Sequence, residues 1–263
     1  MSAPAVRNGA VPGASFVPTA AYQEALLKAS EMVTRHGILL VTGPPGVGKS
    51  ATCRQVMATL EDDKRLPGVW VQLGTKPSPK EVICQLLHAL GMRPRRTEPA
   101  WVLALELGDL LASTPRTVWI YDAHRLRTDA YTTIRTIHDR LDAQWTCTLI
   151  GTGELTKRLN RDQPELLSRV GRRVTMDRMR DDGELVATLT RWHPLLAGVS
   201  RDRLLRMNRV GPKGSFRAWD ELLATLVRLT ATTGELTEQV EAVALHQCSY
   251  TLPAVLARHL AAA

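Results

Sequence analysis

The chain has 263 residues, of which 44% are apolar, enough for one large domain or for a core domain with a small appendage. Its four cysteines are far apart and form no CxxC pair, which argues against a zinc site or a disulfide framework. The formal net charge of +8 favours a polyanionic partner, with nucleic acid first, although a solvated basic surface is the alternative. There is no secretory signal pattern and no stretch long enough to span a membrane, so we expect a cytoplasmic protein with no membrane partner.

Predicted strands and helices alternate along the first two thirds of the chain. Residues 20–35 show helical apolar spacing, and the apolar strand "GILLVTG" then runs into a glycine-rich turn. Strands are also expected at "GVWVQLG", "TVWIYD" and "WTCTLIGTG". Further helices are expected at 49–60, 78–90, 99–113 and 128–142. This alternation predicts an α/β fold with a central parallel sheet flanked by helices.

Changes of composition divide the chain into four predicted parts. Residues 1–20 are rich in Ala, Pro, Gly and Ser and are expected to form a flexible arm, followed by an α/β nucleotide-binding core at 21–180. From about 181 the pattern indicates helices and turns without a convincing strand, so residues 181–250 are expected to form a small helical lid. Residues 251–263 form a tail with one apolar face, which would dock on the lid or on a partner.

The segment "GPPGVGKS" matches the phosphate-binding pattern G-x-x-x-x-G-K-[ST] without a gap, with a strand before it and a helix pattern after it. Glycines let the backbone wrap around phosphate, and the N-terminus of the next helix favours negative charge. Lys49 is expected to reach the β and γ phosphates, and the Ser50 hydroxyl to ligate Mg²⁺. The expected cofactor-binding residues of this loop are Gly43, Pro44, Pro45, Gly46, Val47, Gly48, Lys49 and Ser50. We therefore predict binding of a nucleoside triphosphate, ATP, with Mg²⁺.

The segment "TVWIYDAHRL" offers a single acid where P-loop ATPases commonly carry two adjacent ones. If Asp122 is the strand-end acid that holds the metal, the position of the catalytic glutamate is taken by Ala123. If the strand ends one residue earlier, Tyr121 replaces the metal acid and Asp122 takes the position of the base. Either way one carboxylate is absent, so we expect weak or absent hydrolysis.

The strand "TCTLIGTGEL" ends at Gly151 and Thr152, beside the strand that carries the acid. A polar residue at such a strand tip can touch the γ-phosphate or its water. Thr152 is therefore a candidate sensor, with a simple turn residue as the alternative.

Taken in order, these motifs resemble the AAA+ regulators of DNA transposition, the TnsC, TniB and MuB family. The resemblance spans residues 35–226 and includes the P-loop, "YDAHRL", "LIGTGEL", "LNRDQPELLSRVGRRV" and "GSFRAW". It implies an AAA+ fold, and it places Tyr121 over the family's metal aspartate and Asp122 over its glutamate. It also implies that Arg169 is an arginine finger offered to the neighbouring subunit's γ-phosphate, with Arg172 and Arg173 as alternatives. Arg217 resembles the sensor arginine of the lid, which reaches the phosphates.

Two predicted loops carry clustered cations, "GTKPSPKEV" and "MRPRRTEPA". In the resembled family, loops at these places face DNA, whereas a solubilising loop is the alternative. Contacts of this kind hold the backbone without reading bases. The candidate DNA-binding residues are Lys76, Lys80, Arg93, Arg95, Arg96 and Thr97.

The resemblance implies an ATP-dependent DNA-binding regulator of transposition, which assembles as an oligomer or filament on duplex DNA, marks the target site and recruits or activates the transposase. A TniQ-like targeting protein is a further implied partner. The first alternative is a helicase loader or replication initiator, which would usually carry a winged-helix domain for which the tail after residue 230 leaves no room. The second is a nucleotide-gated signalling module whose basic loops contact proteins.

Overall fold

The computed structural model describes residues 11–95 and 97–261, and they form two compact units. The α/β unit comprises Ala20–Pro45 and Lys49–Met176. The helical unit comprises Gly46–Gly48 and the described residues of 11–19 and 177–261. The helical unit therefore combines an N-terminal segment with the C-terminal third of the chain.

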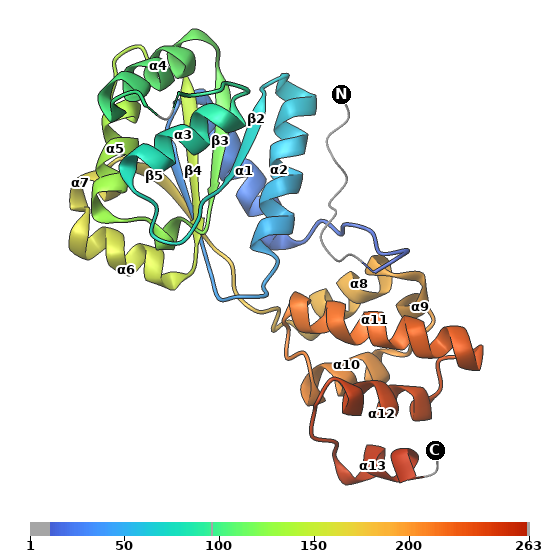
Figure 1. Ribbon diagram of the computed structural model, residues 1–263. Helices are drawn as coiled ribbons and strands as arrows, with labels where there is room; N and C mark the ends of the chain where they lie inside the picture. Colours follow the sequence, from blue (N-terminus) through green and yellow to red (C-terminus); the bar gives the residue numbers. More distant parts are fainter. Residues whose placement is uncertain (1–10, 96, 262–263) are drawn as a thin grey trace. The chain divides into compact units, whose positions relative to one another are not determined.

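The α/β unit is built on a five-stranded parallel sheet in the order β2-β3-β4-β1-β5 (Figure 1). The strands are β1 Ile38–Thr42, β2 Gly68–Gln72, β3 Arg116–Tyr121, β4 Trp145–Gly151 and β5 Val170–Thr175. The helices of this unit are α1 Ala20–Thr34, α2 Lys49–Lys64, α3 Pro79–Ala89, α4 Ala100–Ser113, α5 Thr128–His138, α6 Gly153–Asp162 and α7 Pro164–Ser168, with a 3₁₀ turn, η1, at Ala123–Arg125. The expected α/β fold with a central parallel sheet is confirmed.

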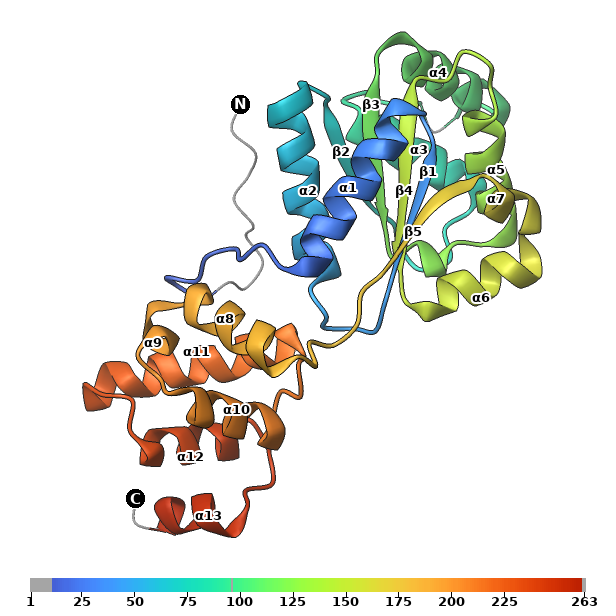
Figure 2. The same ribbon diagram turned by 180° about the vertical axis from the view of Figure 1, so that it is seen from behind.

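Helices cover both faces of this sheet, α1 and α2 on one and α3 and α5 on the other (Figures 1 and 2). Every residue of β1 and of β4 is consequently buried, which is why these strands read as almost continuous apolar runs. Parallel strands bring their carboxyl ends to one edge of the sheet. The loops that follow β1, β2, β3 and β4 therefore share that edge, where α/β proteins place their ligand sites.

Two local expectations differ from the structure. The helix expected over 128–142 ends at His138, and Asp139 is its C-cap. The strand β5 was not expected, because "VGRRVT" carries a glycine and two adjacent arginines in place of an apolar run. It is an edge strand that pairs with β1 alone, and only Val174 among its residues is buried. Half-exposed edge strands tolerate such polar composition.

The helical unit has its own apolar core. Its helices are α8 Asp182–Trp192, α9 Pro194–Ala197, α10 Arg201–Val210, α11 Phe216–Thr233, α12 Glu238–Gln247 and α13 Ala254–Ala261. The central helix α11 buries Trp219 and three leucines in that core. Nothing among the helices of the described residues is both long and apolar enough to cross a membrane.

Both chain ends of the described structure contribute to this helical core. Val11, in the segment expected to be an arm, is buried there, and the Ser15 N–H donates to the Trp192 carbonyl at 2.9 Å. Leu256 of α13, in the segment expected to be a tail, is buried in the same core. These segments therefore share one core with the helices of residues 182–247.

Candidate functional site

The P-loop connects the strand β1 to the helix α2. The strand ends at Thr42 and the helix begins at Lys49, as the phosphate-binding pattern requires. Gly43 lies against the backbone of Met176, the residue that follows β5. A Cβ on Gly43 would be 2.1 Å from the Met176 carbonyl oxygen. Gly48 has a φ of +90°, which residues with a side chain rarely adopt. The glycines of the motif are therefore required by the path of the backbone.

Lys49 places a buried cation inside this loop. Its ammonium donates to the carbonyl oxygens of Gly43 at 2.8 Å and of Pro44 at 2.7 Å. Ser50 follows as the second residue of α2, so its hydroxyl is at the N-terminal end of a 16-residue helix. A glycine-lined loop, a buried ammonium and a helix N-terminus together fit the phosphates of a nucleotide.

The acid strand ends in a stack of rings. Tyr121 is the last residue of β3, and its ring stacks on that of Trp70 from β2, with the centroids 5.8 Å apart. The guanidinium of Arg54, on α2, lies 4.3 Å from the centroid of the Trp70 ring. The Tyr121 ring therefore occupies the position that the resemblance gives to the metal aspartate. It packs on Trp70 of β2, which in turn contacts Arg54 of α2.

Asp122 is the first residue beyond β3 and adopts a left-handed conformation with a φ of +56°. Its carboxylate lies 3.5 Å from Nε of Arg125 and 4.0 Å from Nδ1 of His124. Burial lowers the pKa of His124, so at neutral pH this imidazole is uncharged and the cationic partner of Asp122 is Arg125. The end of β3 at Tyr121 is the strand end that the second of the two registers assumes.

A metal at this site would have few protein ligands. Ser50 and Asp122 are the two oxygen donors that the sequence motifs offer. Across the described residues, no group of three or more His, Cys, Asp or Glu side chains gathers to hold a metal ion. Mg²⁺ commonly keeps several waters and binds through substrate phosphates, so these two donors fit it only together with a nucleotide.

Thr152 lies next to the P-loop strand. The strand β4 lies between β3 and β1, and Gly151 pairs with Thr42, so Thr152 follows the sheet edge beside the start of the P-loop. Thr152 is also the N-cap residue of α6, yet its hydroxyl makes no cap hydrogen bond. This position suits a hydroxyl that bonds a phosphate or a water.

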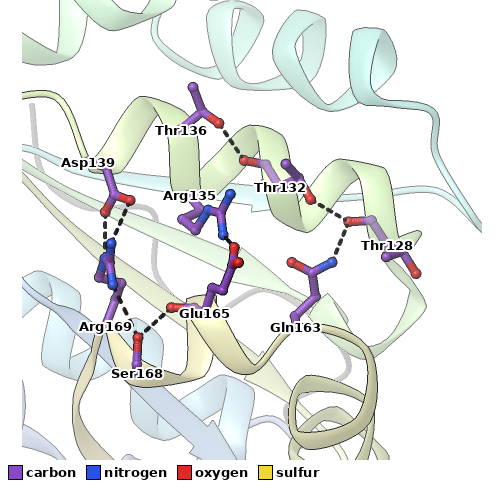
Figure 3. A network of polar contacts seen from close by, with 9 residues as sticks. All are labelled: Thr128, Thr132, Arg135, Thr136, Asp139, Gln163, Glu165, Ser168 and Arg169. Carbon is purple, nitrogen blue, oxygen red and sulfur yellow. Dashed lines mark hydrogen bonds and ion pairs between the residues drawn. The ribbon is translucent and has the colours of Figure 1, made fainter.

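Arg169, the candidate arginine finger, is paired with Asp139 at the C-terminal end of helix α5 (Figure 3). Its Nε and one terminal nitrogen bond the two carboxylate oxygens of Asp139 at 2.8 and 3.1 Å, and the other terminal nitrogen donates to Ser168 Oγ at 3.1 Å. An ion pair between Arg135 and Glu165 lies beside this one in the same contact between α5 and α7. Arg169 is thus a half-exposed side chain with a preset orientation.

The other candidate arginines lie elsewhere. Arg172 and Arg173 are in β5, where the Arg172 guanidinium pairs with Glu31 of α1 and the Arg173 carbonyl accepts from Lys28 at 2.7 Å. Arg217 is the second residue of α11, and its backbone N–H donates to the Gly46 carbonyl, in the same unit, at 3.1 Å.

The two cation-bearing segments lie at opposite ends of helix α3. Lys76 and Lys80 are at its N-terminal end, whereas Arg93, Arg95 and Thr97 follow its C-terminal end. Helix α3 has 11 residues, which corresponds to about 16 Å along its axis. Arg96 lies outside the described residues. The structure therefore separates the predicted DNA contacts into two groups.

Comparisons with known proteins agree with this architecture. The family model described as "AAA domain" matches residues 32–159. The ORC2 protein of Aeropyrum pernix, solved in ADPNP and ADP complexes, superposes with a TM-score of 0.72 at 14% identity, over 90% of this chain and 69% of that one. The chain has the AAA+ P-loop fold.

Two further AAA+ structures are similar over most of this chain. The Drosophila ORC structure bound to DNA gives a TM-score of 0.64 at 15% identity, over 91% of this chain and 62% of that one. Domain III of the Thermotoga maritima replication initiation protein DnaA gives 0.61 at 15%, over 88% and 94%. No curated protein sequence matches the chain significantly. Identities this low show the AAA+ fold alone.

Sequence reasoning missed four side chains at this edge of the sheet. Arg54 and Trp70 build the stack with Tyr121, and Arg127 and Arg158 line a hollow together with Lys76. Only Arg127 carried a usable signal, because it stands immediately before the helix that follows the acid strand.

Proposed function

We propose that the chain is an ATP-dependent DNA-binding regulator of transposition. ATP with Mg²⁺ is bound at the P-loop and promotes assembly of an oligomer or helical filament on duplex DNA. The assembly marks the target site and recruits or activates a transposase, with a TniQ-like protein as the targeting partner. This assignment to transposition rests on the ordered series of motifs, from "GPPGVGKS" to "GSFRAW".

One observation carries the proposed use of ATP: the chain has a complete P-loop, but a single carboxylate follows the strand β3. Lys49, Ser50 and the glycine backbone supply what binding needs, and the similar ORC2 protein was solved with ADPNP and ADP. Fast hydrolysis needs a metal acid and a residue that orients water, and Tyr121 replaces one of them. The chain therefore uses ATP chiefly as a ligand for assembly.

The proposed DNA contacts come from the two ends of α3. Lys76, Arg93 and Arg95 are exposed, and the similar Drosophila ORC was solved bound to DNA. Cations on such segments neutralise phosphates and release counterions, so binding tolerates any sequence and weakens with salt.

The test is retention of the full chain on duplex DNA with a non-hydrolysable ATP analogue. If four cations contact phosphate, the affinity should fall about 100-fold between 50 and 200 mM salt, with a slope of about −3.6 in a log–log plot. Duplexes of unrelated sequence should bind with similar affinity. Absence of retention at low salt would overturn the DNA-binding proposal and favour the nucleotide-gated signalling module.

Two variants test whether Arg169 is an arginine finger or acts only through its ion pair with Asp139. Arg169→Ala and Asp139→Ala both remove the same half-exposed ion pair, so each should lower the free energy of unfolding only slightly. Only Arg169→Ala should abolish ATP-dependent assembly, measured by light scattering or electron microscopy. Equal loss of assembly in both variants would show that Arg169 acts through its ion pair with Asp139 and is not an arginine finger.

A replication initiator or helicase loader is the second candidate, because the similar structures include ORC and DnaA domain III. The two functions differ in what the DNA-bound protein recruits. Stimulation of a transposase on the DNA that the chain occupies supports the first proposal. Loading of a helicase onto that DNA, with no effect on strand transfer, supports the second.

A further inference from the structure

An open hollow at the carboxyl edge of the sheet gathers cations from three separate segments. It lies entirely in the α/β unit, and its lining residues are Lys76, Arg127, Thr128, Asp129, Thr132 and Arg158. Lys76 follows β2, Arg127 follows η1, and Arg158 is on α6. Three cations meet one carboxylate here, so the hollow has a net charge of two positive.

The hollow also receives the N-terminal end of α5. Arg127 is the N-cap residue of this 11-residue helix, and its own side chain makes no cap hydrogen bond, whereas the Asp129 carboxylate accepts from the Ala130 N–H at 3.0 Å. The N–H groups of Ala130 and Tyr131 bond the Arg127 carbonyl, which leaves the N–H groups of Thr128 and Asp129 directed out of the first turn. The partial positive charge of the helix end thus adds to that of the side chains.

One of the three cations is oriented by the protein itself. One terminal nitrogen of Arg158 donates to the His124 carbonyl, which holds the guanidinium on the hollow. The loop residue Lys76 has a left-handed φ of +51° and an exposed side chain. Such a fixed guanidinium beside a helix end is suited to the oxygens of a tetrahedral anion.

The Asp129 carboxylate competes with a bound anion for Arg127. Its carboxylate lies 3.3 Å from Arg127, and both side chains are about half-exposed, so this pair is worth little in free energy. A phosphate in the hollow would be paired by three cations at once, whereas the Asp129 carboxylate pairs with Arg127. The carboxylate therefore weakens anion binding without preventing it.

We propose that this hollow binds a backbone phosphate of nucleic acid, with Arg127, Arg158 and Lys76 as its cationic ligands. The inference rests on the DNA binding proposed above and deepens it, because it adds Arg127 and Arg158 to the contact surface and selects the N-terminal end of α3 as the closer contact. The phosphate lies against the first turn of α5.

The test compares two Arg–Asp surface pairs of the same chain. Arg127→Gln and Asp129→Asn alter the pair in the hollow. Arg180→Gln and Asp177→Asn make the same charge changes in an exposed pair outside the α/β unit that does not line the hollow. Binding of the full chain to a labelled duplex is measured by anisotropy with a non-hydrolysable ATP analogue.

Arg127→Gln should weaken DNA binding about tenfold and reduce the magnitude of the salt slope by about 1, whereas Asp129→Asn should tighten binding. Both control variants should change the affinity less than about twofold, as expected for charges away from the contact. Equal effects of the two pairs would overturn the proposal, because they would show a diffuse effect of net charge.

A second arm separates this inference from DNA binding itself. Inorganic phosphate is titrated in the presence of the saturating ATP analogue, and the melting temperature of the protein is followed. If the wild type fails to bind DNA, the proposed function falls and so does the assignment to backbone phosphate. If the wild type binds DNA and Arg127→Gln loses only the stabilisation by free phosphate, the occupant is a free anion, which also overturns the assignment.

Discussion

Replacing Lys49 with alanine should lower the affinity for ATP about 1000-fold, or about 4 kcal/mol, and should abolish assembly on DNA. The Lys49 ammonium is buried in the P-loop, where it donates to two backbone carbonyls, so the substitution removes the positive charge that this loop holds in place. Equilibrium binding of a fluorescent ATP analogue measures the first effect, and electron microscopy with duplex DNA measures the second.

The matched control for this substitution is Lys64→Ala at the other end of the same helix. Lys64 is exposed, so its loss should leave ATP affinity within about twofold of the wild type. Circular dichroism should show that both variants keep the helical content of the wild type. Tight ATP binding by a folded Lys49→Ala variant would contradict the assignment of the phosphate site.

The double substitution Tyr121→Asp with Asp122→Glu should raise ATP turnover about 10²- to 10³-fold over a slow wild type. The change restores a metal acid at the last residue of β3 and lengthens the acid that follows it. The magnitude is that of one electrostatic group placed at a reacting phosphate or water. Release of inorganic phosphate, measured with and without DNA, tests the expectation.

Two single variants isolate the effect. Asp122→Glu alone should leave turnover low, because the metal acid is still absent. Tyr121→Asp also removes the stacked pair with Trp70, which should cost about 1 kcal/mol of stability, so the control is Tyr121→Asn, which removes the stack without adding an acid. A wild-type rate within the range of about 1 to 100 s⁻¹ that is usual for phosphoryl transfer by kinases would refute weak hydrolysis.

The fold could largely be predicted from the sequence, because four of the five strands are apolar runs that begin or end at turn residues, and three of them, β1, β3 and β4, are mostly buried. β1 and β4 are buried along their whole length, so both read as apolar. β5 could not be predicted, since an edge strand needs few apolar residues, and the pairing with β1 that holds it is a tertiary contact.

The candidate site was only partly predictable. The P-loop residues are contiguous in the chain, so a local pattern specifies them. The ring of Tyr121 instead depends on Trp70 and Arg54, which come from two other elements. The partner of Arg169 is Asp139, thirty residues away. The three cationic residues of the hollow likewise come from three separate segments of the chain. Only the folded chain brings such residues together.

Helix α3 sets a spacing on any nucleic acid that contacts both of its ends. Its residues span Pro79–Ala89, with Lys76 before it and Arg93 after it. A length of about 16 Å corresponds to about five base pairs of duplex at 3.4 Å per pair. Half a turn of the double helix therefore separates the two groups of cations. A straight duplex lying along α3 would then present its major groove to one group and its minor groove to the other.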